Sequence, residues 1–71
     1  MRNLILTTTD GVMVLDGIGR NYPELMQRDD GLLGISWDGT RGVFVYRDRV
    51  EHFEDVSLVE EWFTYWDEHP P

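Results

Sequence analysis

The chain has 71 residues, which allows one domain at most and a core barely large enough to support it. Hydrophobic residues make up 41%, so the chain is too apolar to be disordered, and the lack of cysteine excludes disulfides and Cys-based zinc sites. Fourteen acidic residues against six arginines give a net charge of −8, which disfavours direct binding to nucleic acids and anionic membranes.

The first strands are predicted around Asp10-Gly11. This dipeptide separates the apolar stretches at 3–9 and 12–16, and Asp-Gly between apolar stretches is typical of a hairpin with a type I′ turn. Asp16-Gly17 and Gly19 then interrupt the pattern, so we expect a surface loop up to residue 31. Pro23 favours one short helical turn within it, at 23–28.

A second hairpin is predicted at Asp38-Gly39, between "LLGISW" and "TRGVFVY". Residues 43–47 alternate, with Val43, Val45 and Arg47 on one face and Phe44 and Tyr46 on the other, as in a strand with two different faces. We expect residues 49–53 to extend the sheet. His52 and Glu54 would then share a strand face, which allows a metal-binding pair; we favour an ordinary sheet histidine beside a surface carboxylate and expect no bound metal.

A C-terminal helix is predicted at 57–69. Ser57 and Glu60 have the spacing of a capping box. On a helical wheel that starts at Leu58, the aromatic residues fall on one side and the acidic residues on the other. We therefore expect an α+β fold, in which an antiparallel four- to five-stranded β-sheet of consecutive hairpins packs against one C-terminal amphipathic helix. The single domain, 1–71, would consist of a β-meander at 1–55 and this helix.

Most of the negative charge lies in the last third of the chain. Residues 1–50 carry seven acids and six arginines, whereas residues 51–71 carry seven acids and no arginine. No arginine or lysine stands at helical spacing from the helix acids. Because such a surface attracts basic proteins, these acids are the candidate protein-binding residues: Glu51, Glu54, Asp55, Glu60, Glu61, Asp67 and Glu68.

The order of these motifs resembles a group of small acidic proteins encoded in tailed-phage and prophage genomes near tail genes. The resemblance rests on "LILTTTDGV", "NYPEL", "GISWDGTRGVFVYRD" and "EEWFTYW", and its most specific part is Trp37-Asp38-Gly39. The run "RVEHFED" fits the group least well. The resemblance implies a phage context rather than a particular activity, with location in the host cytoplasm or in the virion.

Three functions are compatible with these patterns. The first is a non-enzymatic interaction module, tail-associated or an assembly factor, that binds a basic protein through the acidic residues and an exposed sheet edge. The alternative is an anti-defence inhibitor, such as an anti-CRISPR or nuclease inhibitor, that mimics nucleic acid. A third, less favoured hypothesis is a small-ligand site around Arg20, Tyr22 and Arg41. Neither catalytic motifs nor cofactor motifs are present, so we expect no enzyme activity and no cofactor.

Overall fold

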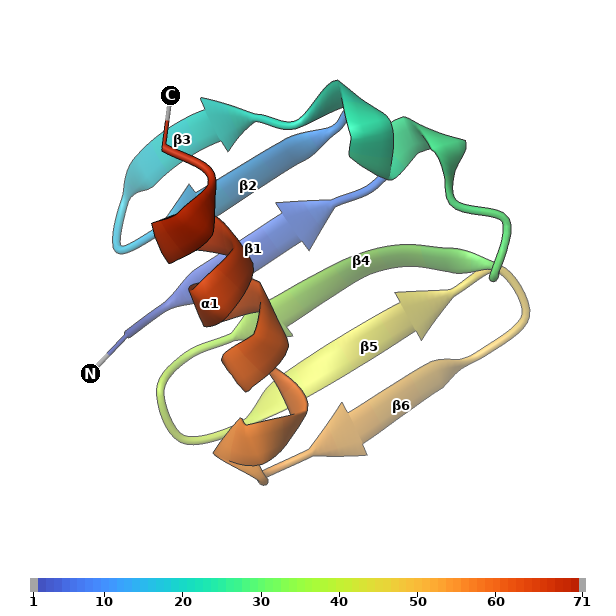
Figure 1. Cartoon of the computed structure of the whole chain (residues 1–71). Coiled ribbons are helices and arrows are strands. Elements are labelled where there is room, and N and C mark those ends of the chain that lie inside the picture. The colour runs from blue at the N-terminus through green and yellow to red at the C-terminus, as the bar shows by residue number, and fades with distance from the viewer. Residues whose placement is uncertain (1, 71) are drawn as a thin grey trace.

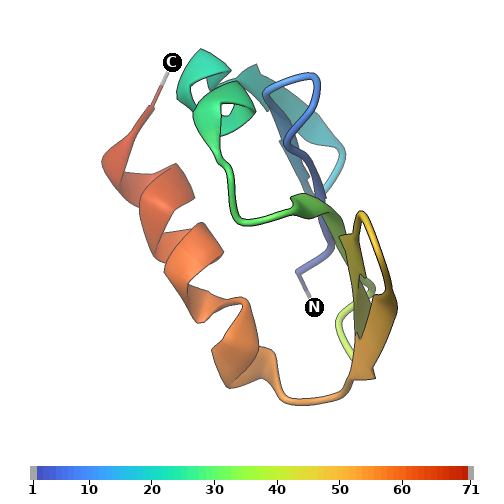
Figure 2. The same ribbon diagram turned by 90° about the vertical axis from the view of Figure 1, so that its right-hand side faces the viewer.

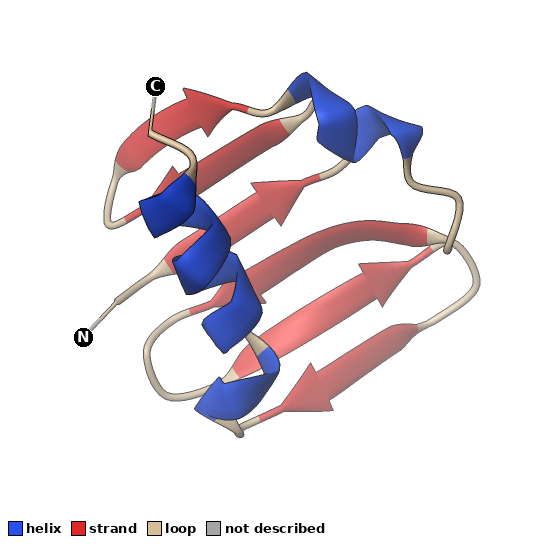
Figure 3. Ribbon diagram, in the orientation of Figure 1, coloured by secondary structure: helices blue, strands red, loops and turns tan. Residues whose placement is uncertain are grey.

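The computed structural model describes residues 2–70, which form a six-stranded antiparallel sheet and one C-terminal helix (Figures 1 and 3). The strands are β1 (Leu4–Thr7), β2 (Val12–Leu15), β3 (Ile18–Asn21), β4 (Leu32–Trp37), β5 (Gly42–Tyr46) and β6 (Val50–Phe53). The helical segments are the 3₁₀ turns η1 (Pro23–Gln27) and η2 (Val56–Leu58) and the helix α1 (Glu60–Glu68). The α+β class is confirmed, but the sheet has six strands rather than four or five.

The sheet consists of two three-stranded meanders placed side by side. Its strand order is β3-β2-β1-β4-β5-β6, so the first strand of the chain lies in the middle of the sheet and pairs with both β2 and β4. The expected meander is therefore interrupted between β3 and β4. The connection between these strands contains η1 and passes the ends of β2 and β1 (Figure 1).

The strand that sequence reasoning missed is β3. Leu15 pairs directly with Ile18, which leaves Asp16 and Gly17 as a two-residue turn. Both have positive φ, 50° and 83°, as a type I′ turn requires. Asp16-Gly17 is thus a tight hairpin turn and not the interruption that the sequence predicts.

The hairpin predicted at Asp10-Gly11 is confirmed by the pairing of β1 with β2, but its predicted type I′ turn is wrong. Thr7 pairs with Val12, so the loop has four residues, and within it only Gly11 has positive φ, at 64°. The buried Thr8 hydroxyl donates a hydrogen bond of 2.6 Å to the carbonyl oxygen of Leu32 in β4. Through this hydrogen bond, the longer loop attaches the β1–β2 hairpin to β4 of the neighbouring meander.

Helix α1 covers one face of the sheet (Figure 2). The core between the two layers contains aliphatic side chains from β1 and β2, aromatic side chains from the helix, and residues from β4 and η1: Leu4, Leu6, Met13, Leu15, Tyr22, Leu25, Leu32, Ile35, Trp37, Val59, Trp62, Phe63 and Trp66. The expected alternation in β5 is confirmed, because Phe44 and Tyr46 pack against this core.

The expected capping box at Ser57 is not formed. Both the backbone N–H and the hydroxyl of Ser57 donate to the Asp55 carboxylate, at 3.0 and 2.7 Å, so the hydroxyl does not act as a cap for α1. The α-helix begins only at Glu60, after η2, and its N-cap residue Val59 makes no side-chain cap bond. Leu58 consequently falls outside the helical phase and is 47% exposed.

Candidate protein-binding surface

The outer side of α1 carries the four helix acids among the predicted binding residues. Trp62, Phe63 and Trp66 are buried beneath the helix. The exposed positions on its other side are Thr64 and four acids, Glu60, Glu61, Asp67 and Glu68, which we call the acidic helix surface. Two turns separate the first pair of acids from the second, which is about 11 Å along the helix axis. The separation that the helical wheel predicted is confirmed within Glu60–Glu68.

The other three predicted acids precede the helix and are less available. Asp55 is occupied by Ser57, whose side-chain and backbone hydrogen bonds lower the pKa of Asp55. Glu51 lies on the edge strand β6 and accepts a hydrogen bond from Arg49. Glu54 lies beyond the end of β6 and has no hydrogen bond or ion pair within residues 2–70.

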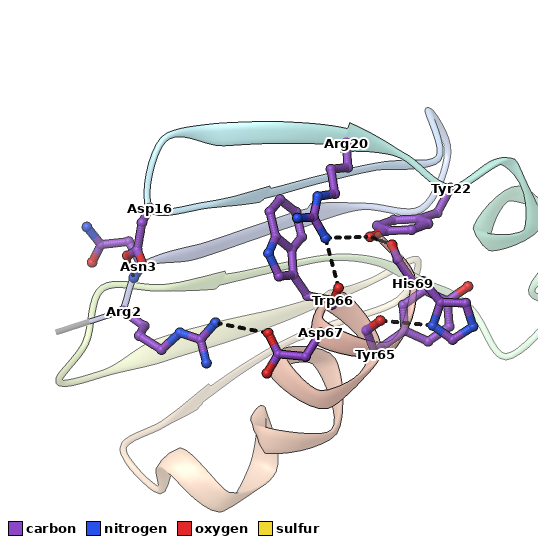
Figure 4. Close-up of polar contacts among 9 residues, drawn as sticks. All are labelled: Arg2, Asn3, Asp16, Arg20, Tyr22, Tyr65, Trp66, Asp67 and His69. Atoms are coloured by element: carbon purple, nitrogen blue, oxygen red, sulfur yellow. Dashed lines mark hydrogen bonds and ion pairs between the residues drawn. The ribbon is translucent and has the colours of Figure 1, made fainter. Parts of the chain in front are cut away.

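The tertiary structure brings two arginines near the helix acids, although none stands at helical spacing in the sequence. Arg2 lies 3.9 Å from Asp67, with both side chains largely exposed (Figure 4). The pKa of Arg28 is raised, first by its hydrogen bond to Asp30 and to a smaller extent by the charge of Glu61. Glu60 and Glu68, like Glu54, have no such partner within the described part of the chain.

The C-terminal end of α1 is held to β3 and the following turn by a polar and aromatic network (Figure 4). The Tyr22 hydroxyl donates to the carbonyl oxygen of His69 at 2.6 Å, and Arg20 donates to the carbonyl oxygen of Trp66 at 2.8 Å. The Arg20 guanidinium also lies 3.8 Å from the centre of the Trp66 ring. These bonds satisfy carbonyl groups that a helix end leaves without intrahelical partners, and they fix the orientation of the acidic helix surface.

The hypothesis of a small-ligand site is not supported by this arrangement. Arg20 and Tyr22 are used in holding the helix, whereas Arg41 lies in the β4–β5 turn. Arg41 instead lines a hollow of ≈ 330 Å³ together with His52 and Glu54. Within residues 2–70, no group of three or more His, Cys, Asp or Glu residues is arranged to hold a metal ion.

A second contact joins α1 to η1. The Tyr65 hydroxyl donates to the Glu24 carboxylate. Burial, and then this hydrogen bond, raises the pKa of Tyr65 to about 12, while the same hydrogen bond lowers the pKa of Glu24. The His69 ring stacks on Tyr65 at 4.0 Å between ring centres. Sequence analysis missed this contact because the two partners lie 41 residues apart.

Comparisons with protein families, curated proteins and solved structures found no match for this chain. Within residues 2–70, none of the helices has both the length and the apolar character needed to cross a membrane. The strand order and the position of α1 define a two-layer α+β sandwich of one sheet and one helix.

Proposed function

We propose that this protein is a non-enzymatic, phage-encoded interaction module that binds a basic protein, such as a tail or assembly protein, through its acidic helix surface. The main support is that the carboxylates of Glu60 and Glu68 have no hydrogen bond or ion pair within residues 2–70. Both stand on a helix whose other side is buried. Because the helix backbone is already fixed, binding a cationic surface needs to order only the carboxylate side chains and not the backbone. Their negative field also accelerates association with such a partner.

The alternative function, nucleic-acid mimicry by an anti-defence inhibitor, would use the same surface. The two functions differ in the partner and in its competitors. A mimic occupies the cationic groove of a nuclease or guide-RNA complex and is displaced by DNA or RNA. An assembly factor binds a phage protein, and nucleic acid does not displace it.

The test is a comparison of two charge-matched variants in a pull-down from nuclease-treated, phage-infected lysate. The Glu60→Gln/Glu68→Gln variant removes two charges from the acidic helix surface. The Asp10→Asn/Asp29→Asn variant removes two charges from exposed loop positions that are not part of α1. We expect the wild type and the loop variant to retain the same phage protein, and the helix variant to lose it.

The proposal is contradicted if both variants retain the partner equally, because the helix carboxylates would then not contribute to binding. Elution in steps of increasing salt tests the same contact in a second way. A contact between exposed charges weakens as ionic strength rises, so the captured protein should be released as the salt concentration increases. Release of the captured protein by added DNA or RNA would favour the inhibitor function instead.

A further inference from the structure

The sheet face opposite α1, which we call the open sheet face, carries no Asp, Glu or Arg side chain at its paired positions. Strand alternation and register assign to it the residues Ile5, Thr7, Val12, Val14, Gly19, Asn21, Gly34, Ser36, Val43, Val45, Val50 and His52. Asp, Glu and Arg make up 28% of the whole sequence and are absent from these twelve described positions. The charge of this chain is therefore confined to the helix side, the loops and the strand ends.

Half of these positions are β-branched aliphatic residues. An antiparallel sheet with one solvated face usually places polar residues on that face. Here Ile5 is 51% exposed and Val50 is 53% exposed, while the other four valines are partly exposed. An apolar area that extends across neighbouring strands is typical of an interaction surface.

The middle of the open sheet face is also hollowed. Thr7, Gly34, Ser36 and Val45 line a hollow of ≈ 340 Å³ where β1, β4 and β5 run side by side. Gly34 supplies no side chain there, and a bulge between Leu32 and Gly34 shifts the register of β4 against β5. The exposed Ile5 side chain is on the same face, opposite Ser36. The face thus has both a projecting side chain and a recess.

We propose that the open sheet face binds a second copy of this chain, sheet against sheet, with the acidic helices on the two outer sides. Two sheets of equal twist pack face to face at about 10 Å, with their strands within about 30° of each other. In a two-fold arrangement, Ile5 of each copy can enter the recess at Gly34 of the other, because such an interface uses the same patch twice.

The distribution of charge favours a second copy over an unrelated partner. A partner for this face must itself present an uncharged apolar surface, and the open sheet face of another copy satisfies this condition. The strongly negative helix sides would be more than about 20 Å apart across the two sheets. That distance exceeds the screening length of about 8 Å at physiological salt, so repulsion between the two acidic helix surfaces is largely screened.

The available area suggests a weak to moderate dimer. Six strands of four to six residues give the open sheet face a projected area of roughly 400–500 Å² per copy. Two copies would cover roughly 800–1,000 Å², near the lower limit for a specific interface, so we expect a dissociation constant on the order of micromolar.

The test compares Ile5→Arg with Ile18→Arg by sedimentation equilibrium. Both isoleucines are more than half exposed, but Ile18 pairs with Leu15 and so lies on the helix side of the sheet. We expect the wild type and Ile18→Arg to approach twice the 8.4 kDa mass of one chain at about 100 µM. Ile5→Arg would bury an unpaired charge in the interface and should weaken association at least about 100-fold. Circular dichroism establishes that both variants are folded.

Other outcomes would overturn the proposal. A wild-type protein that stays monomeric at about 100 µM would leave this face without a second copy. A dimer that persists in both Ile5→Arg and Val43→Arg would show that association uses another surface, such as the exposed edge of β6. A dimer lost equally in Ile18→Arg would show that added positive charge, rather than the open sheet face, controls association.

Discussion

At the residue scale, the most informative side chain is Tyr22, which is buried and connects the start of η1 to the end of α1. Its hydroxyl donates to the carbonyl oxygen of His69 at 2.6 Å, and its ring packs edge-on against Tyr65 and Trp66. In the sequence this tyrosine appears as part of a polar loop and, with Arg20 and Arg41, as a candidate ligand-binding residue. Its importance comes from a contact between residues 47 positions apart.

Replacing Tyr22 by Phe should therefore lower the free energy of unfolding by about 1–2 kcal/mol, because the hydrogen bond to His69 and the longer one from Arg20, at 3.4 Å, are lost while the packing is kept. Urea unfolding followed by tryptophan fluorescence measures the change. Tyr46→Phe is the control, since the Tyr46 hydroxyl makes no hydrogen bond within residues 2–70; its effect should stay below about 0.5 kcal/mol. Equal losses in both variants would contradict this role of Tyr22.

Tyr65 makes stability depend on alkaline pH. Its pKa is raised from the ordinary value of 10.0 to about 12, so between these values the unfolded chain ionises Tyr65 and the folded protein does not. The stability that Tyr65 contributes is thus fully present below pH 10 and is lost as the pH rises toward 12. We expect Tyr65→Phe to flatten this fall in thermal unfolding scans between the two values. An unchanged pH profile would contradict the assignment.

At the scale of elements, the helix and the strands depend on contacts that only the assembled sheet provides. Gly34 shows this for β4: a Cβ atom at this position would lie 2.7 Å from the carbonyl oxygen of Leu6 in β1. In the sequence, Gly34 is simply one residue of the strand predicted at "LLGISW". A residue without a Cβ atom is required here because β1 pairs with β4, and these strands are far apart along the chain.

The expected consequence is that Gly34→Ala lowers the free energy of unfolding by about 1–3 kcal/mol, since the backbones of β1 and β4 must separate slightly. Gly19→Ala is a matched control on the same sheet face. There the added Cβ would meet only the Val14 side chain, at an ordinary 3.9 Å. Thermal unfolding at the same protein concentration compares them, and a fully stable Gly34→Ala would show that the sheet adjusts without strain.

For α1, the expectation that the sheet requires a helical cover leads to a second prediction. Trp66 is 7% exposed and lies under Arg20, so Trp66→Ala should cost about 3–5 kcal/mol, much of the stability of so small a domain. Deletion of residues 57–71 should unfold the protein entirely. Val56→Ala, at a position 44% exposed, is the control. A truncated protein with the circular dichroism spectrum of the intact chain would refute the prediction.

At the scale of the whole molecule, charge is separated by layer: the helix side carries the acids and the open sheet face carries none at its paired positions. The resulting repulsion among the exposed helix carboxylates opposes folding and is screened by salt. Raising NaCl from about 10 to about 200 mM should therefore raise the melting temperature by about 2–5 °C. The Glu60→Gln/Glu68→Gln variant should show a smaller rise. A melting temperature that falls with salt would mean that attractive ion pairs dominate.

Local sequence determined much of this protein. Apolar alternation and turn residues gave five of the six strands, Pro23 gave the η1 turn, and the wheel of residues 60–68 gave both faces of α1. These features depend on residues within a few positions of one another, which is the range that periodicity and turn chemistry describe.

Tertiary structure decided the rest, because each remaining feature depends on partners that are distant in the chain. Strand register decided which Asp-Gly dipeptide forms a two-residue turn. Asp16-Gly17 forms one, whereas Asp10-Gly11 is part of a four-residue loop. The strand order placed β1 at the centre of the sheet, and the arginine near Asp67 came from the opposite end of the chain. The uncharged open sheet face emerged only when six short strands were aligned, since no single strand of four to six residues shows such a surface.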